Sequence, residues 1–272
     1  MKGPSTRLLI SHIIVRGREL QQIYSTLAAH AFLTEQELQE AFVTPPDVEQ
    51  DPFAFNAATF RETLNFLLII RMVKKQETNH QTVYSASPAR QSLPFSLLLL
   101  HHLTTHPDER QQALAHVYRH LIRQDALSLT LGEVREKLEC VVQPFAFAWT
   151  DEKIAFWAQL AQYVGIIYRL ERDYRLLVAP TPTLLLLAIK QAMKQQQTEY
   201  ANVAACLQFI DEQYFACFTD QHTVHSGITQ TIKVLHGQGK IILTHQADAA
   251  HSLLLQDWRI STIQLPPEGA VE

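Results

Sequence analysis

Residues 61–87 read RETLNFLLIIRMVKKQETNHQTVYSAS. An amphipathic helix is predicted over the first ten residues, and it leads into the apolar pair Met72-Val73. Charged and polar residues follow, and a second short apolar run is centred on Val83-Tyr84. This order predicts a long helix that leads into a two-stranded β-ribbon.

The pattern of residues 61–87 occurs twice more in the chain. Residues 154–180 contain the pair Ile166-Ile167, and residues 226–255 contain the pair Ile241-Ile242. The predicted return strands of the ribbons are Leu176–Val178 in the second copy and Ser252–Leu255 in the third. Each apolar pair is preceded, six positions earlier, by an apolar residue: Phe66, Leu160 and Leu235. Self-similarity of this kind indicates a repeated structural unit.

A second repeated feature lies upstream of the first two ribbons. The decapeptides LTEQELQEAF (33–42) and LTLGEVREKL (129–138) share Leu-Thr-x-x-Glu-apolar-x-Glu-x-apolar. Each predicts a capping box, in which the threonine and the glutamate three positions later satisfy free N–H groups at a helix start. The threonines are 96 positions apart and the pairs beginning at Met72 and Ile166 are 94 apart, so the two features recur at nearly one offset.

Turn and cap residues set the other predicted helix limits. Asn56 is expected to cap a helix over 57–71, and Thr150 a helix that Gly165 ends. The third copy is looser, with a helix expected over roughly 200–214 and another from Ser226 that Gly237 and Gly239 end. The second ribbon is expected to turn at Glu171-Arg172-Asp173, and the tail from Pro266 to Glu272 is expected to be disordered.

These features divide the chain into three units, residues 1–91, 92–181 and 182–272, which we call the first, second and third unit. The predicted fold is mainly α-helical with short β-ribbons. The repeated capping box, long helix and ribbon resemble the winged-helix superfamily over about two thirds of the chain. The resemblance implies three tandem winged-helix-like units, the third degenerate. It also implies a non-enzymatic protein that binds DNA, partner subunits or both, as do replication initiators, transcription regulators and accessory subunits of SMC-type ATPases.

Composition limits the class of protein. The 272 residues are 47% hydrophobic and 18% charged, with only 8 glycines and a net charge of −4. The formal charges of the three units are 0, −1 and −3. A protein that coats DNA is usually basic, so only a local patch could supply phosphate contacts here. Three cysteines in a long chain are typical of the reducing cytoplasm, and the longest leucine runs are too short to cross a membrane.

The first unit carries the strongest candidates for DNA contact. Arg61, Arg71, Lys74 and Lys75 form a positive stretch on the predicted helix and ribbon, opposed only by Glu62. Helices that precede a wing commonly lie in the major groove, while the wing reaches phosphates or the minor groove. The alternative is that these cations form the solvated edge of a ribbon, where lysine also prevents edge pairing.

The third unit carries a second set of candidates, Thr229, Gln230, Thr231 and Lys233, with Lys240 at the wing. They offer small polar groups that could contact bases and two cations. The equivalent helix of the second unit begins with Asp151-Glu152. These acids stabilise the helix dipole but repel phosphate.

Other chemistry has weaker support in the sequence. His102 with His106, and His116 with His120, have i, i+4 spacing, but no further ligand completes a metal site. Cys206, Cys217, His222 and His225 form a looser set, and the cysteines are better explained as small buried residues. Gly237-Gln238-Gly239-Lys240 lacks the remainder of a phosphate-binding loop. We therefore expect no bound metal and no cofactor.

Two functional hypotheses remain, because no acid, base and nucleophile assemble into a catalytic group. In the first, the protein binds double-stranded DNA within a larger DNA-processing or regulatory complex. In the second, it is a scaffold or adaptor whose units dock partner subunits without touching DNA. A continuous basic stripe over residues 57–71 and the wing favours the first hypothesis, and a neutral or apolar patch there favours the second.

Overall fold

A computed structural model describes residues 7–43, 55–78, 81–88, 92–140, 147–170, 175–220, 222–245, 252–255 and 258–267. The predicted turn at 171–173 and the tail beyond Pro267 lie outside these ranges. The chain is mainly α-helical with short antiparallel ribbons, as its sequence predicts. No helix in the described ranges combines the length and apolar character needed to cross a bilayer.

The first unit contains a short 3-10 helix, three α-helices and three strands. They are η1 (Leu9–Ser11), α1 (Gly17–Ala29), β1 (Leu33–Thr34), α2 (Glu35–Phe42), α3 (Ala57–Ile69), β2 (Val73–Thr78) and β3 (Gln81–Ala86). The sheet has the order β1-β3-β2, so the return strand of the ribbon lies in the middle. Asn56 caps α3, with its side chain accepting a hydrogen bond from the Thr59 amide at 2.9 Å.

The second unit repeats this order after one additional helix, α4. Its elements are α4 (Phe95–Thr104), η3 (Glu109–Gln112), α5 (Ala113–Arg123), β4 (Ser128–Leu129), α6 (Leu131–Glu139), α7 (Asp151–Val164), β5 (Tyr168–Leu170) and β6 (Arg175–Leu177). The sheet order β4-β6-β5 again places the return strand in the middle.

Both predicted capping boxes are present with nearly the same geometry. The Thr34 hydroxyl accepts from the Glu37 amide at 3.2 Å, and the Glu37 carboxylate accepts from the Thr34 amide at 2.7 Å. The corresponding distances at Thr130 and Glu133 are 3.2 Å and 2.7 Å. The same local sequence therefore starts the same helix in both units.

The third unit follows the same element order, with an insertion in its ribbon. Its elements are α8 (Pro182–Gln196), β7 (Tyr200–Asn202), α9 (Val203–Gln213), α10 (Ser226–Gly237), β8 (Ile242–Thr244), β9 (Leu253–Leu255), β10 (Trp258–Ile260) and β11 (Thr262–Gln264). The order of its main sheet is β7-β11-β8.

Two predictions for the third unit were wrong. The strand that pairs with β8 is β11, whereas the predicted return strand at 252–255 is β9 and pairs with β10 in a separate hairpin. The helix expected to begin near residue 200 begins at Val203, because Tyr200–Asn202 pairs with β11 instead. Asn202 caps α9 by accepting from the Ala205 amide at 3.1 Å, without the glutamate that marks the other two units.

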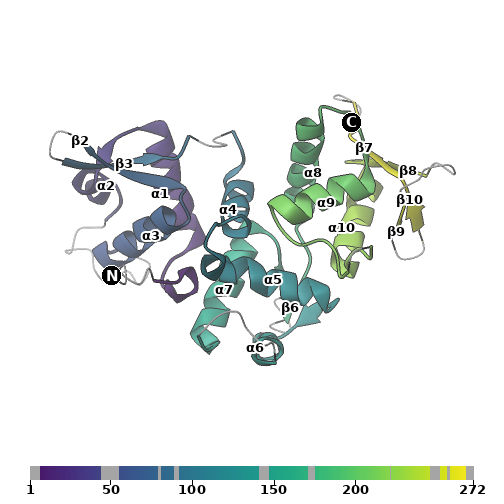
Figure 1. Ribbon diagram of the computed structural model, residues 1–272, viewed down its shortest axis with the longest axis horizontal. Helices are drawn as coiled ribbons and strands as arrows, with labels where there is room; N and C mark the ends of the chain where they lie inside the picture. Colours follow the sequence, from purple (N-terminus) through teal and green to yellow (C-terminus); the bar gives the residue numbers. More distant parts are fainter. Residues whose placement is uncertain are drawn as a thin grey trace.

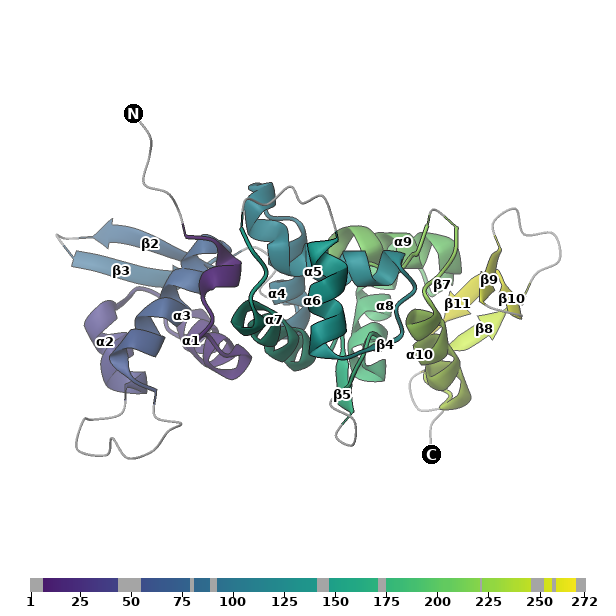
Figure 2. The same ribbon diagram turned by 90° about the horizontal axis from the view of Figure 1, so that it is seen from below.

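The three units lie in a row, with the first and third at opposite ends in both views (Figures 1 and 2). Their buried apolar residues form one contiguous core. Gly17 of α1 lies directly against the ring of Tyr163 on α7, whose hydroxyl donates to the Gln21 side chain. This contact holds the first unit on the second.

The end of α4 links the outer units. His106, just beyond α4, donates from Nε2 to the Ile69 carbonyl of α3 at 2.9 Å. On the other side, His101 and Thr104 donate to the carbonyls of Gln213 and Tyr214, at 3.2 Å and 2.7 Å. The segment 101–106 is therefore held by both the first and the third unit.

Candidate nucleic-acid interface

Helix α3 presents a narrow exposed strip formed by Ala58, Arg61 and Asn65. Arg61, its one cation, lies 3.4 Å from a carboxylate oxygen of Glu35 on α2. The other oxygen of Glu35 accepts a long hydrogen bond from the Tyr84 hydroxyl at 3.5 Å. Because both side chains of this ion pair are largely exposed, the pair contributes little to stability, but it offsets the charge of Arg61.

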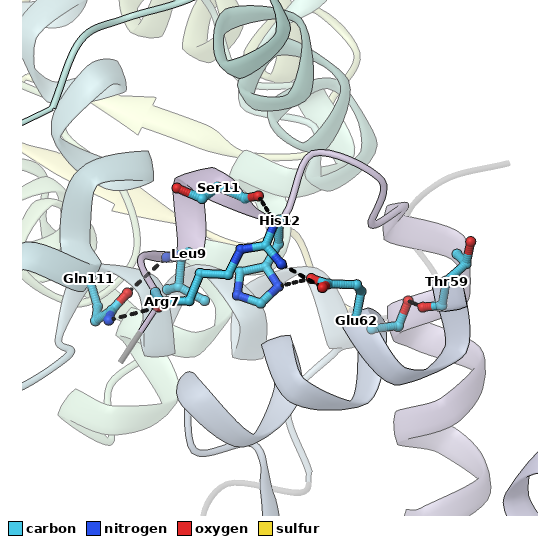
Figure 3. Close-up of polar contacts among 8 residues, drawn as sticks. Arg7, Leu9, Ser11, His12, Thr59, Glu62 and Gln111 are labelled. Atoms are coloured by element: carbon cyan, nitrogen blue, oxygen red, sulfur yellow. Dashed lines mark hydrogen bonds and ion pairs between the residues drawn. The ribbon is translucent and has the colours of Figure 1, made fainter. Parts of the chain in front are cut away.

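The inner side of α3 is held by a polar cluster at the N-terminal segment (Figure 3). Glu62 lies 2.5 Å from both His12 Nδ1 and Arg7 Nη1, and Arg7 also donates to the Ser11 carbonyl at 2.7 Å. His12 is 2% exposed. Burial lowers the pKa of His12, and the Glu62 carboxylate opposes that shift without reversing it. Glu62, expected to oppose the positive stretch, is thus turned toward His12 and Arg7.

The N-terminal segment is also fastened to the second unit. The Leu9 amide donates to the Gln111 side chain at 2.8 Å, and the Gln111 amide group donates to the Arg7 carbonyl at 3.3 Å (Figure 3). Gln111 is buried, so these bonds are shielded from water. The position of α3 is therefore fixed relative to the second unit.

Arg71 follows α3 in an unusual backbone conformation. Its φ angle is 63°, in the left-handed region that side chains other than those of glycine, asparagine and aspartate rarely adopt. The side chain is exposed. Within the described residues it makes no hydrogen bond or ion pair.

Lys74 and Lys75 lie on β2, which is an edge strand, and they point to opposite faces of the ribbon. Lys75 is paired with Tyr84, and so it lies on the face that also carries Arg61 and Glu35. Lys74 is paired with Ser85 and lines a groove together with Arg71. The predicted basic stretch therefore divides into two clusters, and one flat surface cannot contact both lysines.

The groove beside Arg71 and Lys74 lies between the start of β2 and the end of α4. Its other polar lining residues are Ser87, His101, His102, Thr105 and His106. No carboxylate is among the described residues that line it. Arg71, Lys74 and Lys75 also have no carboxylate partner within the described part of the chain, in contrast to Arg7, Arg16, Arg61, Arg135 and Arg175.

The candidates on α10 are only partly accessible. Thr229 is fully buried and Thr231 is 5% exposed, its hydroxyl donating to the Pro180 carbonyl at 3.0 Å, so the prediction that they contact bases is wrong. Gln230 and Lys240 are exposed, and Lys233 is half-buried.

Tertiary packing explains this burial, because the start of α10 rests on the second unit. Ser226 donates twice to the Asp125 carboxylate, both at 3.0 Å. A Cβ atom on Gly227 would lie 2.4 Å from the Val178 carbonyl oxygen, so only glycine allows this approach. The end of α10 that would enter a DNA groove is thus covered.

Helix α7 of the second unit also lacks cations on its exposed strip. Asp151 and Glu152 are exposed at its start, followed by Ala155, Gln159 and Gln162. Asp151 is paired with Arg135 at 2.8 Å. Most other residues of α7 are buried in the core, and half-buried Lys153 donates from its ammonium to the Ala148 carbonyl at 2.7 Å. This helix offers no attractive surface to phosphate.

The histidine pairs do not assemble a metal site. His106 lies beyond the end of α4, so it does not share a helix with His102 despite the i, i+4 spacing. Its Nε2 donates to Ile69 and its Nδ1 accepts from the Asp108 amide at 3.1 Å, which leaves no nitrogen for a metal. His116 and His120 do share α5, but no group of three potential ligands occurs among the described residues.

The cysteine and histidine set is also structural. Cys206 and Cys217 are fully buried, and burial raises the pKa of the Cys206 thiol to about 12. His225 is fully buried and accepts at Nδ1 from the Gly227 amide, which it caps at the start of α10. Gly239 ends α10 with a φ angle of 67°, so the string Gly237–Lys240 is a helix terminus and not a phosphate loop.

Sequence patterns do not reveal how Arg71, Lys74, His101, His102 and Thr105 come together. Arg71 and Lys74 were expected to contact DNA, but the sequence did not indicate that the end of α4 lies opposite them. His101 was not singled out, and His102 was considered only as a metal ligand. The signal that could have identified the groove is the run His101-His102 at the end of a helix that follows the ribbon directly.

The chain matches no model of a known protein family, and no curated protein resembles it in sequence.

Proposed function

We propose that the chain is built from three winged-helix units and that its first unit binds double-stranded DNA within a larger assembly. The element order and the central position of β3, β6 and β11 support the winged-helix assignment. In each case a helix precedes a ribbon whose return strand lies in the middle of a three-stranded sheet.

One observation carries the DNA proposal. Arg71, Lys74 and Lys75 are exposed and lack carboxylate partners among the described residues, and they lie where α3 passes into β2, with the two lysines on opposite faces of the ribbon. Unpaired cations at this point can contact phosphates on both sides of a groove that α3 approaches. The exposed strip of α3 is neutral apart from the paired Arg61, so it supports positioning on the backbone more than base recognition.

The test is a fluorescence-anisotropy titration of a labelled random duplex at several salt concentrations. Binding should weaken as salt increases, because phosphate contacts release counterions. The double variant Lys74→Gln with Lys75→Gln should weaken binding and reduce the magnitude of the salt slope by roughly 2, about one unit per lost phosphate contact.

The matched control removes two exposed lysines of α8, Lys190→Gln with Lys194→Gln, and so changes the net charge equally. It should leave affinity and slope unchanged, because these residues lie in the third unit. Equal losses in both double variants would mean that only net charge matters. Absence of duplex binding at low salt would reject the proposal.

Partner docking by the third unit is a second candidate, and a specific feature favours it. Tyr200 of β7 and Ile242 of β8 lie in one row across the sheet, both opposite Gln264 of β11. Tyr200 is 63% exposed, and Leu254 on the inserted hairpin is 58% exposed. Exposed apolar side chains grouped in this way are typical of protein interfaces.

The test of this candidate is co-purification of the full chain from its own cells. The variant Tyr200→Ser with Ile242→Ser should lose a subunit that the wild type retains in stoichiometric amount, whereas Lys190→Gln with Lys194→Gln should keep it. If the two variants retain the same subunits, the exposed row does not dock a partner.

A further inference from the structure

The helix before each ribbon ends in the same hydrogen-bonding pattern. The amides of Met72, Ile166 and Lys240 donate to the carbonyls of Leu67, Ala161 and Leu235, five residues earlier, at 3.0, 3.0 and 2.9 Å. In each case the preceding residue has a positive φ angle: 63° at Arg71, 89° at Gly165 and 67° at Gly239. Such a helix ending strongly favours glycine at this position.

The first unit therefore has arginine where the other two units have glycine. A residue with a side chain in this conformation loses about 1–2 kcal/mol relative to the right-handed region. The Arg71 side chain makes no hydrogen bond or ion pair among the described residues that would offset this cost. Backbone strain kept without such compensation is typical of functional positions.

The surroundings of Arg71 indicate what it could bind. The groove that it lines with Lys74 has a volume of about 520 Å³, far larger than one water molecule. Two cations lie on the β2 side, and imidazole and hydroxyl groups lie on the α4 side. No described carboxylate lines the groove, and its two charged side chains, Arg71 and Lys74, are both cations that can donate hydrogen bonds to an anion.

The two walls of the groove are held in place independently of any ligand. His106 bonds the α4 side to the end of α3, and His101 bonds it to the third unit. The Ser87 amide donates to the Met72 carbonyl at 2.8 Å and closes the base of the ribbon. Binding would therefore require ordering of the Arg71 and Lys74 side chains, but no movement of the backbone.

We propose that this groove binds a single phosphate group, with Arg71 and Lys74 as its cationic ligands. The planar guanidinium of Arg71 can donate two parallel hydrogen bonds to two phosphate oxygens, and the Lys74 ammonium can approach a third. On the α4 wall, the Thr105 hydroxyl donates to the His101 carbonyl at 2.8 Å and His101 Nδ1 donates to the Gln213 carbonyl, so the two cations supply the hydrogen bonds to the phosphate. The phosphate can belong to the DNA backbone, to a DNA end or to a small molecule. The inference deepens the proposed function at the same site, and its first test does not depend on DNA binding.

The first experiment titrates the full chain with inorganic phosphate and follows backbone amide resonances by NMR, against sodium chloride of equal ionic strength. Saturable shifts should appear at residues 70–75 and 101–106. Lys74→Gln and Arg71→Gly should each weaken phosphate binding roughly tenfold, as expected for one charge-assisted contact. Lys75→Gln is the matched control, because its side chain lies on the other face of β2 and should not affect phosphate.

The second experiment identifies the source of the phosphate. The same variants are titrated with duplexes of equal length that end in 5′-phosphate or 5′-hydroxyl groups. A preference for 5′-phosphate that Arg71→Gly removes assigns the groove to a DNA end, whereas an equal roughly tenfold loss on both duplexes assigns it to the backbone.

The outcomes separate this inference from the proposed function. Phosphate shifts at the groove without duplex binding would reject DNA binding and keep the phosphate site. Duplex binding that Arg71→Gly and Lys74→Gln leave unchanged, with no phosphate shifts at the groove, would overturn the phosphate site and keep DNA binding.

Discussion

Replacing Arg71 with glycine should make the protein more stable. Arg71 and Gly239 end equivalent helices with nearly equal φ angles, 63° and 67°. The left-handed conformation costs a residue with a side chain about 1–2 kcal/mol, and glycine avoids this cost. Glycine in turn loses about 0.5–1 kcal/mol more conformational entropy on folding, because it is freer in the unfolded chain. The free energy of unfolding should therefore rise by about 0.5–1 kcal/mol in Arg71→Gly.

The reciprocal variant Gly239→Arg should lose a similar amount. A Cβ atom at Gly239 would meet nothing within 4 Å, so only the backbone conformation opposes a side chain there. Gly165 is a less suitable partner for this comparison, because a Cβ atom would lie 2.8 Å from the Thr181 hydroxyl oxygen. A chain that carries both Arg71→Gly and Gly239→Arg should be close to the wild type, since the two sites lie in different units.

The assay is urea unfolding followed by circular dichroism, in chloride buffer without phosphate. Midpoints should increase in Arg71→Gly and decrease in Gly239→Arg, with unchanged slopes. A lower midpoint in Arg71→Gly would mean that the arginine side chain stabilises the fold by contacts of its own. The arginine would then be explained by stability, and backbone strain would no longer point to a phosphate ligand.

Three further predictions follow from the buried groups. Burial lowers the pKa of His12, His116, His120 and His225 in the folded protein, so near the ordinary histidine pKa the unfolded chain binds more protons than the folded chain. The free energy of unfolding should therefore fall as pH decreases from 7.5 to 5.5. Urea midpoints that do not change with pH would contradict this prediction. Gly227→Ala should lose about 1–3 kcal/mol of stability, because its Cβ atom would meet the Val178 carbonyl oxygen. Gly237→Ala is the control and should be neutral or stabilising, because a Cβ atom there has open space. Thermal unfolding of both variants measures the difference. Exposed Cys140 should react with a thiol reagent in the native protein, while buried Cys206 and Cys217 should react only when the protein is unfolded. If all three thiols of the native protein react as fast as Cys140, the core is open to the reagent.

Local signals in the sequence predict most of the helix limits. Thr34 and Thr130 with their glutamates start α2 and α6, and Gly165 and Gly239 end α7 and α10. These signals succeed because each is satisfied by hydrogen bonds within a few residues. The start of α9 was misplaced because Asn202 caps it alone and the preceding strand is only three residues long.

Long-range packing explains the errors that local signals could not prevent. Leu253–Leu255 has the composition of a return strand, but β11 occupies that place because it pairs with both β7 and β8. Thr229 reads as a polar group on an amphipathic helix, yet it is buried in the packed protein, where the start of α10 rests on Asp125. Neither outcome can be read from periodicity, since both depend on residues far away in the chain.

Arg71 shows how a repeat can reveal a functional position that no motif contains. Its charge made it a candidate from sequence, but an arginine after a helix is unremarkable by itself. The matching hydrogen bonds of the three helix ends before the ribbons show that the other two units have glycine at the position of Arg71. If all three units had the same role, the same residue would suit all three positions. Arginine replaces glycine in the unit where Lys74 and the end of α4 line a groove. The strained backbone of Arg71 and the two cations of this groove thus occur together in the first unit, which separates it from its two neighbours.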